Sequence, residues 1–398
     1  MGLRNVLRYR RRSIVSGFAI IVSVFVLMLL RGMINGSESM IYDQLVLGQL
    51  GAVQIHKKGF AANVSNPPLS FAFDVDDAFM AKVRAVPGVQ DASARIFFPC
   101  LTNANDKTVA TPVLAIDPAH EYNVCPLKTG DVTEGKLVSA DSSVMTQLLR
   151  RQLGLELGDE VTLVSQDFEG VMNAAVLKSG GYLNGIPLLT TSKKLLFVPL
   201  ATAQELLRVE GKAVEVAVST DDFLHPEDLK ARMQAALGGE YEVEMWRDRA
   251  EMVIDSMRTR RAILGWVSVI FLGIALIGVA NTMLMSVLGR TREIGTMMAV
   301  GMKRIQIVEL FISEALVLGI FASLLGALLG QALVLFLHAR GLTLMVQAGS
   351  PPFTMRPTVE WDYTLRMAAY VSLGCAVASI YPAYRASRLK PIEAMGAV

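Results

Sequence analysis

The sequence predicts a membrane α-helical protein with four transmembrane helices and a large α+β extracytoplasmic domain inserted between helices 1 and 2. Three observations support this fold class. The 398 residues are 52% hydrophobic and only 19% charged, whereas soluble domains carry about 25% charged residues. Four apolar runs are long enough to cross the hydrocarbon core of a bilayer, which takes about 20 residues. A long polar segment separates the first run from the second.

The apolar runs set the predicted domain boundaries. The first run follows a basic stretch, as a signal peptide does, but it is long, lacks a small-x-small cleavage site and precedes three further runs. We therefore expect it to be a membrane helix. The predicted parts are a basic N-terminus (1–13), helix 1 with its stalk (14–34), the α+β domain (35–260), helix 2 (261–288), a short basic segment (289–306), helix 3 (307–337), an outer loop (338–364), helix 4 (365–384) and a tail (385–398).

The basic residues predict the orientation, because short cytoplasmic segments carry an excess of lysine and arginine. Such residues cluster in the N-terminus, between helices 2 and 3, and in the tail, whereas the loop between helices 3 and 4 has only Arg340 and Arg356. All three clusters lie on one side if the helices alternate in direction. Both termini are then cytoplasmic. The net charge of only +2 gives no reason to expect a nucleic-acid partner.

The polar segment alternates short β-type runs with amphipathic helical runs, which indicates an α+β domain. We expect two related lobes with an insert near residues 120–195. The stretches 31–47 and 247–261 continue membrane helices, either as ordinary helix ends or as rigid links to the domain. Strands are predicted over 51–56, 94–101, 111–116, 160–165, 195–199, 214–219 and 241–246, and helices over 75–86, 142–153, 201–208 and 226–237.

Motifs for catalysis or metal binding are absent from the printed sequence. It contains no H-E-x-x-H, no G-x-S-x-G, no paired-cysteine metal spacing and no G-x-x-x-x-G-K-[ST] phosphate loop. We therefore expect no catalytic residues, no metal site and no ATP hydrolysis by this chain alone. Cys100 and Cys125 share the polar segment, so a disulfide and two free thiols both remain open, whereas Cys375 is expected to be inert packing.

Polar and small residues within the apolar runs predict contacts between helices. Glu314 is expensive in a membrane, so it either couples helices or lies near the headgroups. Asn281 and Gln331 are expected to form interhelical hydrogen bonds, and the row Gly319, Gly326 and Gly330 to allow close helix packing.

The segment between helices 2 and 3 has an apolar face formed by Ile294, Met297, Met298 and Val300. Such a short amphipathic helix lies either on the membrane or in a groove of a cytoplasmic partner. The string REIGTMMAVGMKRIQI, which follows NTMLMSV, resembles the coupling segment of the MacB/LolCE/FtsX superfamily of ABC permeases. The third apolar run and the ending YPAYRASRLKPIEAM are similar to further family signatures. MINGSESMI and GAVQIHKKGF resemble the LolC/LolE branch, so the resemblance covers nearly the whole chain.

The resemblance implies a mechanotransmission mechanism in the bacterial inner membrane. A separate ABC ATPase, which would bind the ATP and Mg, moves the coupling segments, and the stalks carry that motion to periplasmic domains. This chain would then be a non-catalytic permease subunit that pairs with a second permease chain, identical or related, and extracts lipoproteins or other amphipathic substrates from membrane lipid. Alternatives are MacB-like export of peptides or toxins with a periplasmic adaptor, and FtsX-like regulation of a periplasmic enzyme. The implied ATPase contacts are Arg292, Glu293, Ile294, Gly295, Met297, Ala299, Val300 and Gly301.

Overall fold

The computed structural model describes residues 10–60, 69–126, 128–129, 132–183, 194–344 and 353–388. The chain divides into two compact units. One contains the described residues from Met40 to Asp255, and the other contains the described residues outside that range.

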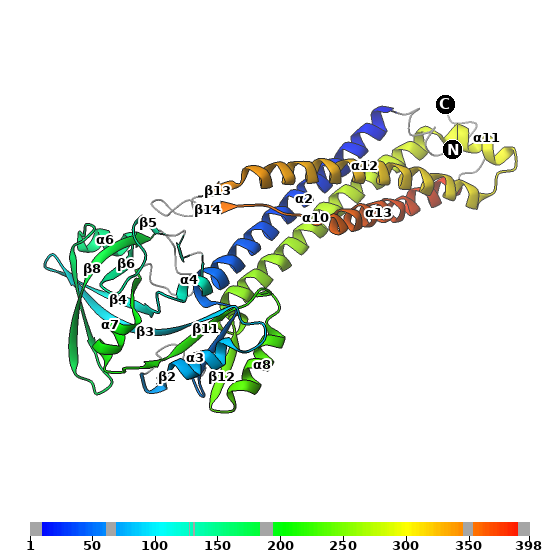
Figure 1. The fold of residues 1–398 in the computed structure, drawn as a ribbon. Helices are drawn as coiled ribbons and strands as arrows, with labels where there is room; N and C mark the ends of the chain where they lie inside the picture. Colours follow the sequence, from blue (N-terminus) through cyan, green and yellow to red (C-terminus); the bar gives the residue numbers. More distant parts are fainter. Residues whose placement is uncertain are drawn as a thin grey trace. The chain divides into compact units, whose positions relative to one another are not determined.

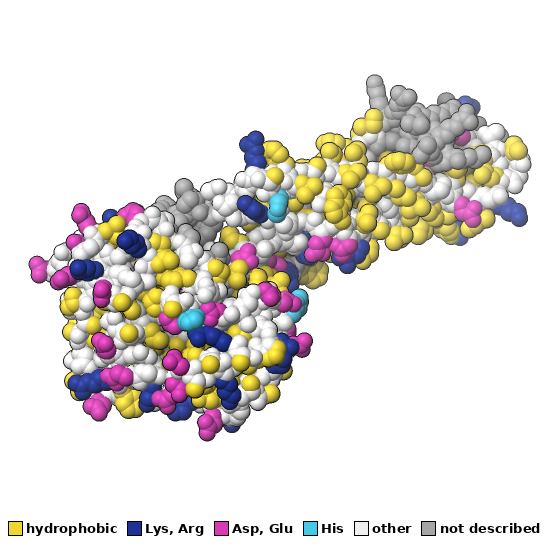
Figure 2. All heavy atoms as spheres, in the orientation of Figure 1, with side chains coloured by type: hydrophobic (Ala, Val, Ile, Leu, Met, Phe, Trp, Pro, Cys, Tyr) yellow, Lys and Arg dark blue, Asp and Glu magenta, His cyan; other side chains and the backbone are white. Residues whose placement is uncertain are grey.

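The second unit contains four helices that are long and apolar enough to cross a membrane, which confirms the predicted fold class. Figure 2 shows hydrophobic side chains over much of their surface, as expected for helices that contact lipid. A short helix, α11 (Thr291–Ala299), lies in sequence between the second and third, and strands β13 (Leu342–Leu344) and β14 (Phe353–Met355) pair after the third. The long helices are α2 (Arg10–Leu45), α10 (Glu251–Gly289), α12 (Arg304–Arg340) and α13 (Trp361–Ser387) (Figure 1).

These helices extend beyond the apolar runs. Helix α10 begins at Glu251, within the charged stretch predicted to continue helix 2. Helix α2 continues to Leu45 and ends in a π-helical turn, Val46–Leu50. Helix α13 includes Pro382 and continues to Ser387, a few residues beyond the predicted end of helix 4 at 384. Proline is tolerated inside a membrane helix where neighbouring groups satisfy the backbone. Helices α2 and α10 therefore contribute residues to both units.

The first unit is built on one ten-stranded sheet among its described residues. Strand β7 pairs with both β3 and β8, so β3, β4, β9, β6, β8 and β7 form a closed ring. Strands β12, β1 and β11 extend the sheet in the order β12-β1-β11-β3, and β5 pairs with β8. The strands are β1 (Val53–Lys57), β3 (Asp91–Ala104), β4 (Lys107–Ile116), β5 (Val132–Gly135), β6 (Ser142–Thr146), β7 (Glu160–Gln166), β8 (Met172–Leu183), β9 (Leu196–Pro199), β11 (Glu215–Ser219) and β12 (Tyr241–Met245), and β2 (Phe73–Asp74) pairs separately with β10 (Lys212–Ala213).

The expected insert at 120–195 supplies β5 to β8, and these pair with β3 and β9 from outside it. One expectation for this unit is wrong. The predicted helix at 142–153 begins as a strand, β6, and becomes helical only at Gln147. Val144 and Thr146 are β-branched and lie in register with β8, which favours the extended conformation.

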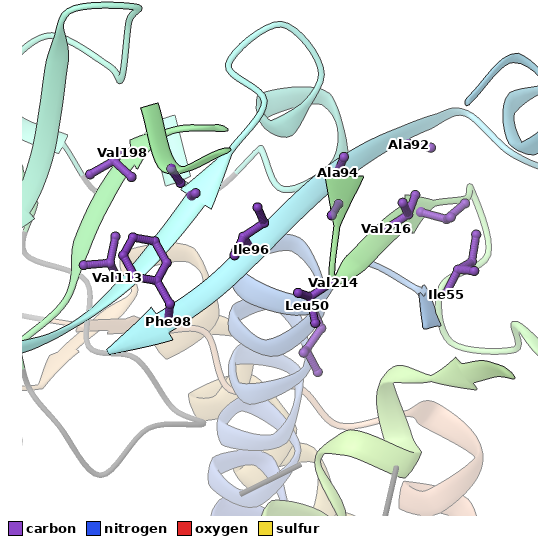
Figure 3. Packing of buried hydrophobic residues seen from close by; sticks show 14 of the residues in the cluster. Leu50, Ile55, Ala92, Ala94, Ile96, Phe98, Val113, Val198, Val214 and Val216 are labelled. Carbon is purple, nitrogen blue, oxygen red and sulfur yellow. The ribbon is translucent and has the colours of Figure 1, made fainter. Parts of the chain in front are cut away.

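The core of this unit lies between the sheet and short helices. Alternate residues of the strands, such as Ile96 and Phe98 on β3, point into it (Figure 3). The end of α2 also contributes, through Leu45, Val46 and Leu50. Cys100 and Cys125 are free and buried, so the structure contains two thiols and no disulfide between them. The helices are α3 (Asp77–Arg84), α4 (Glu121–Val124), α6 (Gln147–Leu153), α7 (Leu200–Leu207), α8 (Glu227–Leu237) and α9 (Trp246–Arg249).

Candidate coupling site at helix α11

Helix α11 is held against the ends of the long helices by one apolar anchor. Ile294 is fully buried and packs in a cluster with Val287 of α10, Ile307 and Phe311 of α12, and Ala383 of α13. Gly295 is also buried, and Met297 and Met298 are partly buried against the same cluster. The inner face of α11 therefore contacts three helices of its own chain.

A buried ion pair reinforces this anchor. Arg290, which precedes α11, lies with its Nη1 3.1 Å from Oε2 of Glu314 on α12. Both side chains are only 6% exposed. Glu293 of α11 is a second acidic neighbour of Arg290, with its Oε2 3.9 Å from Nε of Arg290. The pair therefore ties the start of α11 to α12, because breaking a buried ion pair is strongly destabilising.

The opposite face of α11 and the turn after it are exposed. Val300, which follows the last residue of α11, has 86% of its surface exposed. Gly301 follows with a φ of +102°, a conformation that favours glycine and turns the chain toward α12. Of the implied ATPase contacts, the exposed ones are Arg292, Glu293, Ala299, Val300 and Gly301. Ile294 and Gly295 are enclosed by their own chain.

The glycine row of α12 lies where other helices approach closely. A methyl group on Gly330 would come within 2.6 Å of Cβ of Met28 on α2, and one on Gly326 within 2.7 Å of the carbonyl oxygen of Ile21. One on Gly319 would meet Cβ of Cys375 on α13 at 3.0 Å. Only glycine permits these distances without a shift of the neighbouring helix.

The two amides of the long helices differ in their surroundings. Gln331 is buried and donates from Nε2 to the carbonyl oxygen of Val359 at 3.1 Å, and its Oε1 accepts from Thr364. Asn281 is exposed on α10. Among the described residues we find no hydrogen-bond partner for it, so the structure does not bring Asn281 to the contacts expected within this chain.

Arg290 is the functional candidate that sequence reasoning missed. The sequence presents it only as one of the basic residues between helices 2 and 3 that indicate orientation, and it names no partner for Glu314. The available signal is that an acid inside an apolar run usually pairs with a cation, and the first basic residue of the adjoining segment can supply one.

Comparison with known proteins identifies the family. A MacB-like periplasmic core domain matches residues 13–236, more than half of the chain, and an FtsX-like permease C-terminal domain matches residues 265–391. The chain belongs to the MacB/FtsX superfamily of ABC transporter permeases. It is a multi-pass membrane protein with a periplasmic-type α+β domain.

Several relatives share parts or all of this permease. The macrolide export ATP-binding/permease protein MacB of Nitrobacter winogradskyi is 30% identical over 59% of this chain and 37% of its own length. The pyoverdine export protein PvdT of Pseudomonas fluorescens is 24% identical over 98% of this chain and 57% of its own. The chain thus spans about a third of the length of the MacB relatives it matches. The ABC transporter permease YvrN of Bacillus subtilis is 24% identical over 99% of this chain and 98% of its own.

Solved structures are similar to about half of the chain. The extracellular domain of the transporter YknZ from Gram-positive bacteria covers 48% of it, with 13% identity and a TM-score of 0.36. The periplasmic region of MacB from Actinobacillus actinomycetemcomitans covers 52%, with 12% identity and a TM-score of 0.36.

Proposed function

We propose that this permease couples a separate ABC ATPase, bound at α11, to the extraction of an amphipathic or lipid-anchored substrate, with lipoproteins as the specific cargo. The division of α11 into a buried and an exposed face carries the proposal. Its buried face is fixed to α10, α12 and α13 through Ile294 and the Arg290–Glu314 pair. Its exposed residues Arg292 and Glu293, with the apolar Val300 just beyond its end, offer a charged and apolar surface to a cytoplasmic partner.

A second permease chain is part of the proposal. Helix α10 has only 17% of its most apolar stretch buried, compared with 39% for each of the other three long helices. Its exposed residues include Ile270 and Ile277, and a methyl group added at Gly273 or Gly278 would meet no other part of the chain within 4 Å. Small residues and a polar amide such as Asn281 are typical of helix contacts in membranes. We infer that α10 packs against a second permease.

The link from the membrane helices to the periplasmic-type unit involves both stalks. Glu38 of α2 accepts a hydrogen bond from Nε of Arg261 on α10 at 2.6 Å, and a second one from the same guanidinium. Nearer the domain, Tyr42 makes an edge-to-face contact with Trp246 at 5.3 Å between ring centroids. Two stalks joined in this way would move together, as mechanotransmission requires.

The ATPase proposal is tested by affinity purification. Tagged protein solubilised in mild detergent is purified, and retained proteins are identified by mass spectrometry. We expect an ATPase with a phosphate-binding loop, and its loss on Val300→Asp and on Glu293→Lys. Glu309→Lys, a charge reversal at an exposed site of α12, is the matched control. The proposal would be contradicted if all variants retained the same amount of ATPase, or if the native protein retained none.

The cargo is tested separately. In cells depleted of this protein, we expect triacylated lipoproteins to accumulate in the inner membrane. Normal release of lipoproteins from the inner membrane in these cells would exclude lipoproteins as the cargo. The second candidate cargo, an exported peptide or amphiphile, is favoured by the macrolide and pyoverdine exporters among the relatives. Under that alternative, depletion leaves lipoproteins unchanged and raises sensitivity to, or retention of, an amphiphile.

A further inference from the structure

A row of charged residues crosses four strands on one face of the sheet. Arg95 of β3 lies opposite Glu215 of β11, and His56 of β1 lies opposite Glu242 of β12. Glu215 joins the two pairs, since its carboxylate oxygens lie 3.2 Å from Nη1 of Arg95 and 3.1 Å from Nε2 of His56. The other ring nitrogen of His56 lies 3.1 Å from Glu244.

The centre of this row is buried. The side chain of His56 is 0% exposed and that of Arg95 is 2% exposed. Nη2 of Arg95 donates to the buried Glu121 of α4 at 2.6 Å, and Glu121 also contacts Lys128. Charges in such a place require good partners, because each loses its hydration. In other proteins, well-packed apolar residues in place of a buried ion pair are often as stabilising, so the burial of these charges is not by itself evidence of a stabilising role.

Arg95 also holds the end of α2. Its Nη1 donates to the carbonyl oxygen of Gln49 at 2.8 Å, and Nε2 of Gln54 donates to that of Leu50 at 3.1 Å. A helix ends in carbonyl groups without helical partners and with partial negative charge, so a guanidinium is a suitable cap. The capped segment, Val46–Leu50, is the π-helical turn. Such turns recur at functional sites.

The beginning of the other stalk contacts the same row. Arg249, at the end of α9 and just before α10, lies 4.0 Å from Glu215. Its guanidinium also lies over the ring of Phe60, and that ring stacks on His56 with 4.0 Å between centroids. Glu215 therefore contacts both the cation that caps α2 and the cation that precedes α10.

We propose that Arg95, Glu215 and His56 form a joint that positions both stalk ends on the sheet, and that the charge of His56 sets how tightly the joint holds. These are positioning residues. They would pass stalk movement to the domain without touching the substrate. The transport role rests on the proposed function, but the joint itself does not.

The electrostatics of the joint give its pH dependence. Burial alone would lower the pKa of His56, and Arg249 also lowers it, but Glu215 and Glu244 outweigh both, so the pKa of His56 is raised. Burial would raise the pKa of Glu215, but His56 and the charges of Arg95 and Arg249 hold it well below its usual range. Glu242 faces the same row and accepts a hydrogen bond from the Gly59 amide. A raised histidine pKa stabilises the fold fully below about pH 6.5, and that contribution is lost as pH rises through the raised value.

Hydrogen exchange on the full-length protein in lipid nanodiscs tests the joint. Exchange is followed from pH 6 to 9 and corrected for its intrinsic pH dependence. In the native protein we expect protection of residues 46–50 to fall on the order of tenfold as pH rises, with β7 and β8 unchanged. His56→Gln should show weak protection at every pH. Arg95→Lys should lose protection of 46–50 because lysine cannot bridge Gln49, Glu121 and Glu215 together. Arg150→Lys, at an ion pair with Glu134, is the control.

Two results would overturn the proposal. One is the same pH profile in His56→Gln as in the native protein. The other is exchange that rises equally in 46–50 and in β7 and β8, which would mean a structural role only. His56→Gln preserves side-chain volume, so it decides the question even if Arg95→Lys fails to fold. Hydrogen exchange is measured without the ATPase. A negative result in this experiment is therefore distinguishable from a failure to capture an ATPase in the affinity purification.

Discussion

At the residue scale, Arg290 and Glu314 give the sharpest prediction. Glu314→Leu removes the buried acid of the pair and leaves the buried Arg290 with the more exposed Glu293, and breaking a buried pair costs about 3–5 kcal/mol of unfolding free energy. The measurement is thermal unfolding in detergent, compared with Glu309→Leu at an exposed site of the same helix. The double variant Arg290→Met with Glu314→Leu should recover most of the stability, because both charges are gone, but not ATP-driven transport. Equal melting of the two single variants would show that the pair contributes nothing.

The glycines of the long helices provide a matched pair of substitutions. Gly330→Ala places a methyl group 2.6 Å from Cβ of Met28, and such overpacking destabilises by about 1–3 kcal/mol. Gly265→Ala meets nothing within 4 Å and should be neutral or stabilising, since alanine favours a helix over glycine by about 1 kcal/mol. Melting temperatures in detergent compare the two, and a similar response from both would argue against close packing of α12 on α2.

Other residue contacts could not be predicted from the sequence. The sequence contains four histidines, and no motif in it distinguishes His56 from the others. Its partner Glu215 is 159 positions away, and only the pairing of β1 with β11 brings them together. By contrast, Cys375 in an apolar run was correctly expected to be buried.

At the element scale, α10 is the helix whose exposed face most needs a partner. A cysteine at Ile277, which is 71% exposed, should form a disulfide-linked dimer on mild oxidation if two copies pair through α10. If the partner is a related chain, the product appears only when that chain carries the matching cysteine. Leu325→Cys, on an exposed part of α12, is the control. Cross-linking at Leu325 but not at Ile277 would assign the contact to another helix.

Helix α11 shows how far periodicity can be used. Ile294, Met297 and Met298 were predicted as one apolar face, and they lie in or against one cluster. Val300 was placed on the same face, yet it is exposed. The reason is that α11 ends at Ala299 and the chain turns at Gly301. Helical spacing therefore no longer applies to Val300, and an end of this kind is the least predictable part of a helix.

At the scale of the whole molecule, the membrane helices could be predicted from the sequence, but the pairing of strands in the sheet could not. Length and hydropathy suffice for spanning helices, because lipid forces the backbone to bond internally. The closed ring of β3, β4, β9, β6, β8 and β7 depends on pairings between distant segments, such as Leu101 with Val164. No local pattern encodes these pairings, so the segment 120–195 looked like an insert although it completes the ring.

The central claim is that the exposed end of α11 contacts an ABC ATPase. The most direct measurement is site-specific photo-crosslinking in living cells, with a photoreactive amino acid at Val300 and, as a control, at Ile263 of α10, which is also apolar and exposed. We predict that Val300 captures one cytoplasmic protein, identified by mass spectrometry as an ATPase with a phosphate-binding loop, and that Ile263 does not. Capture of lipid alone at Val300, or of the same proteins at both positions, would contradict the account and leave α11 as a membrane-surface helix.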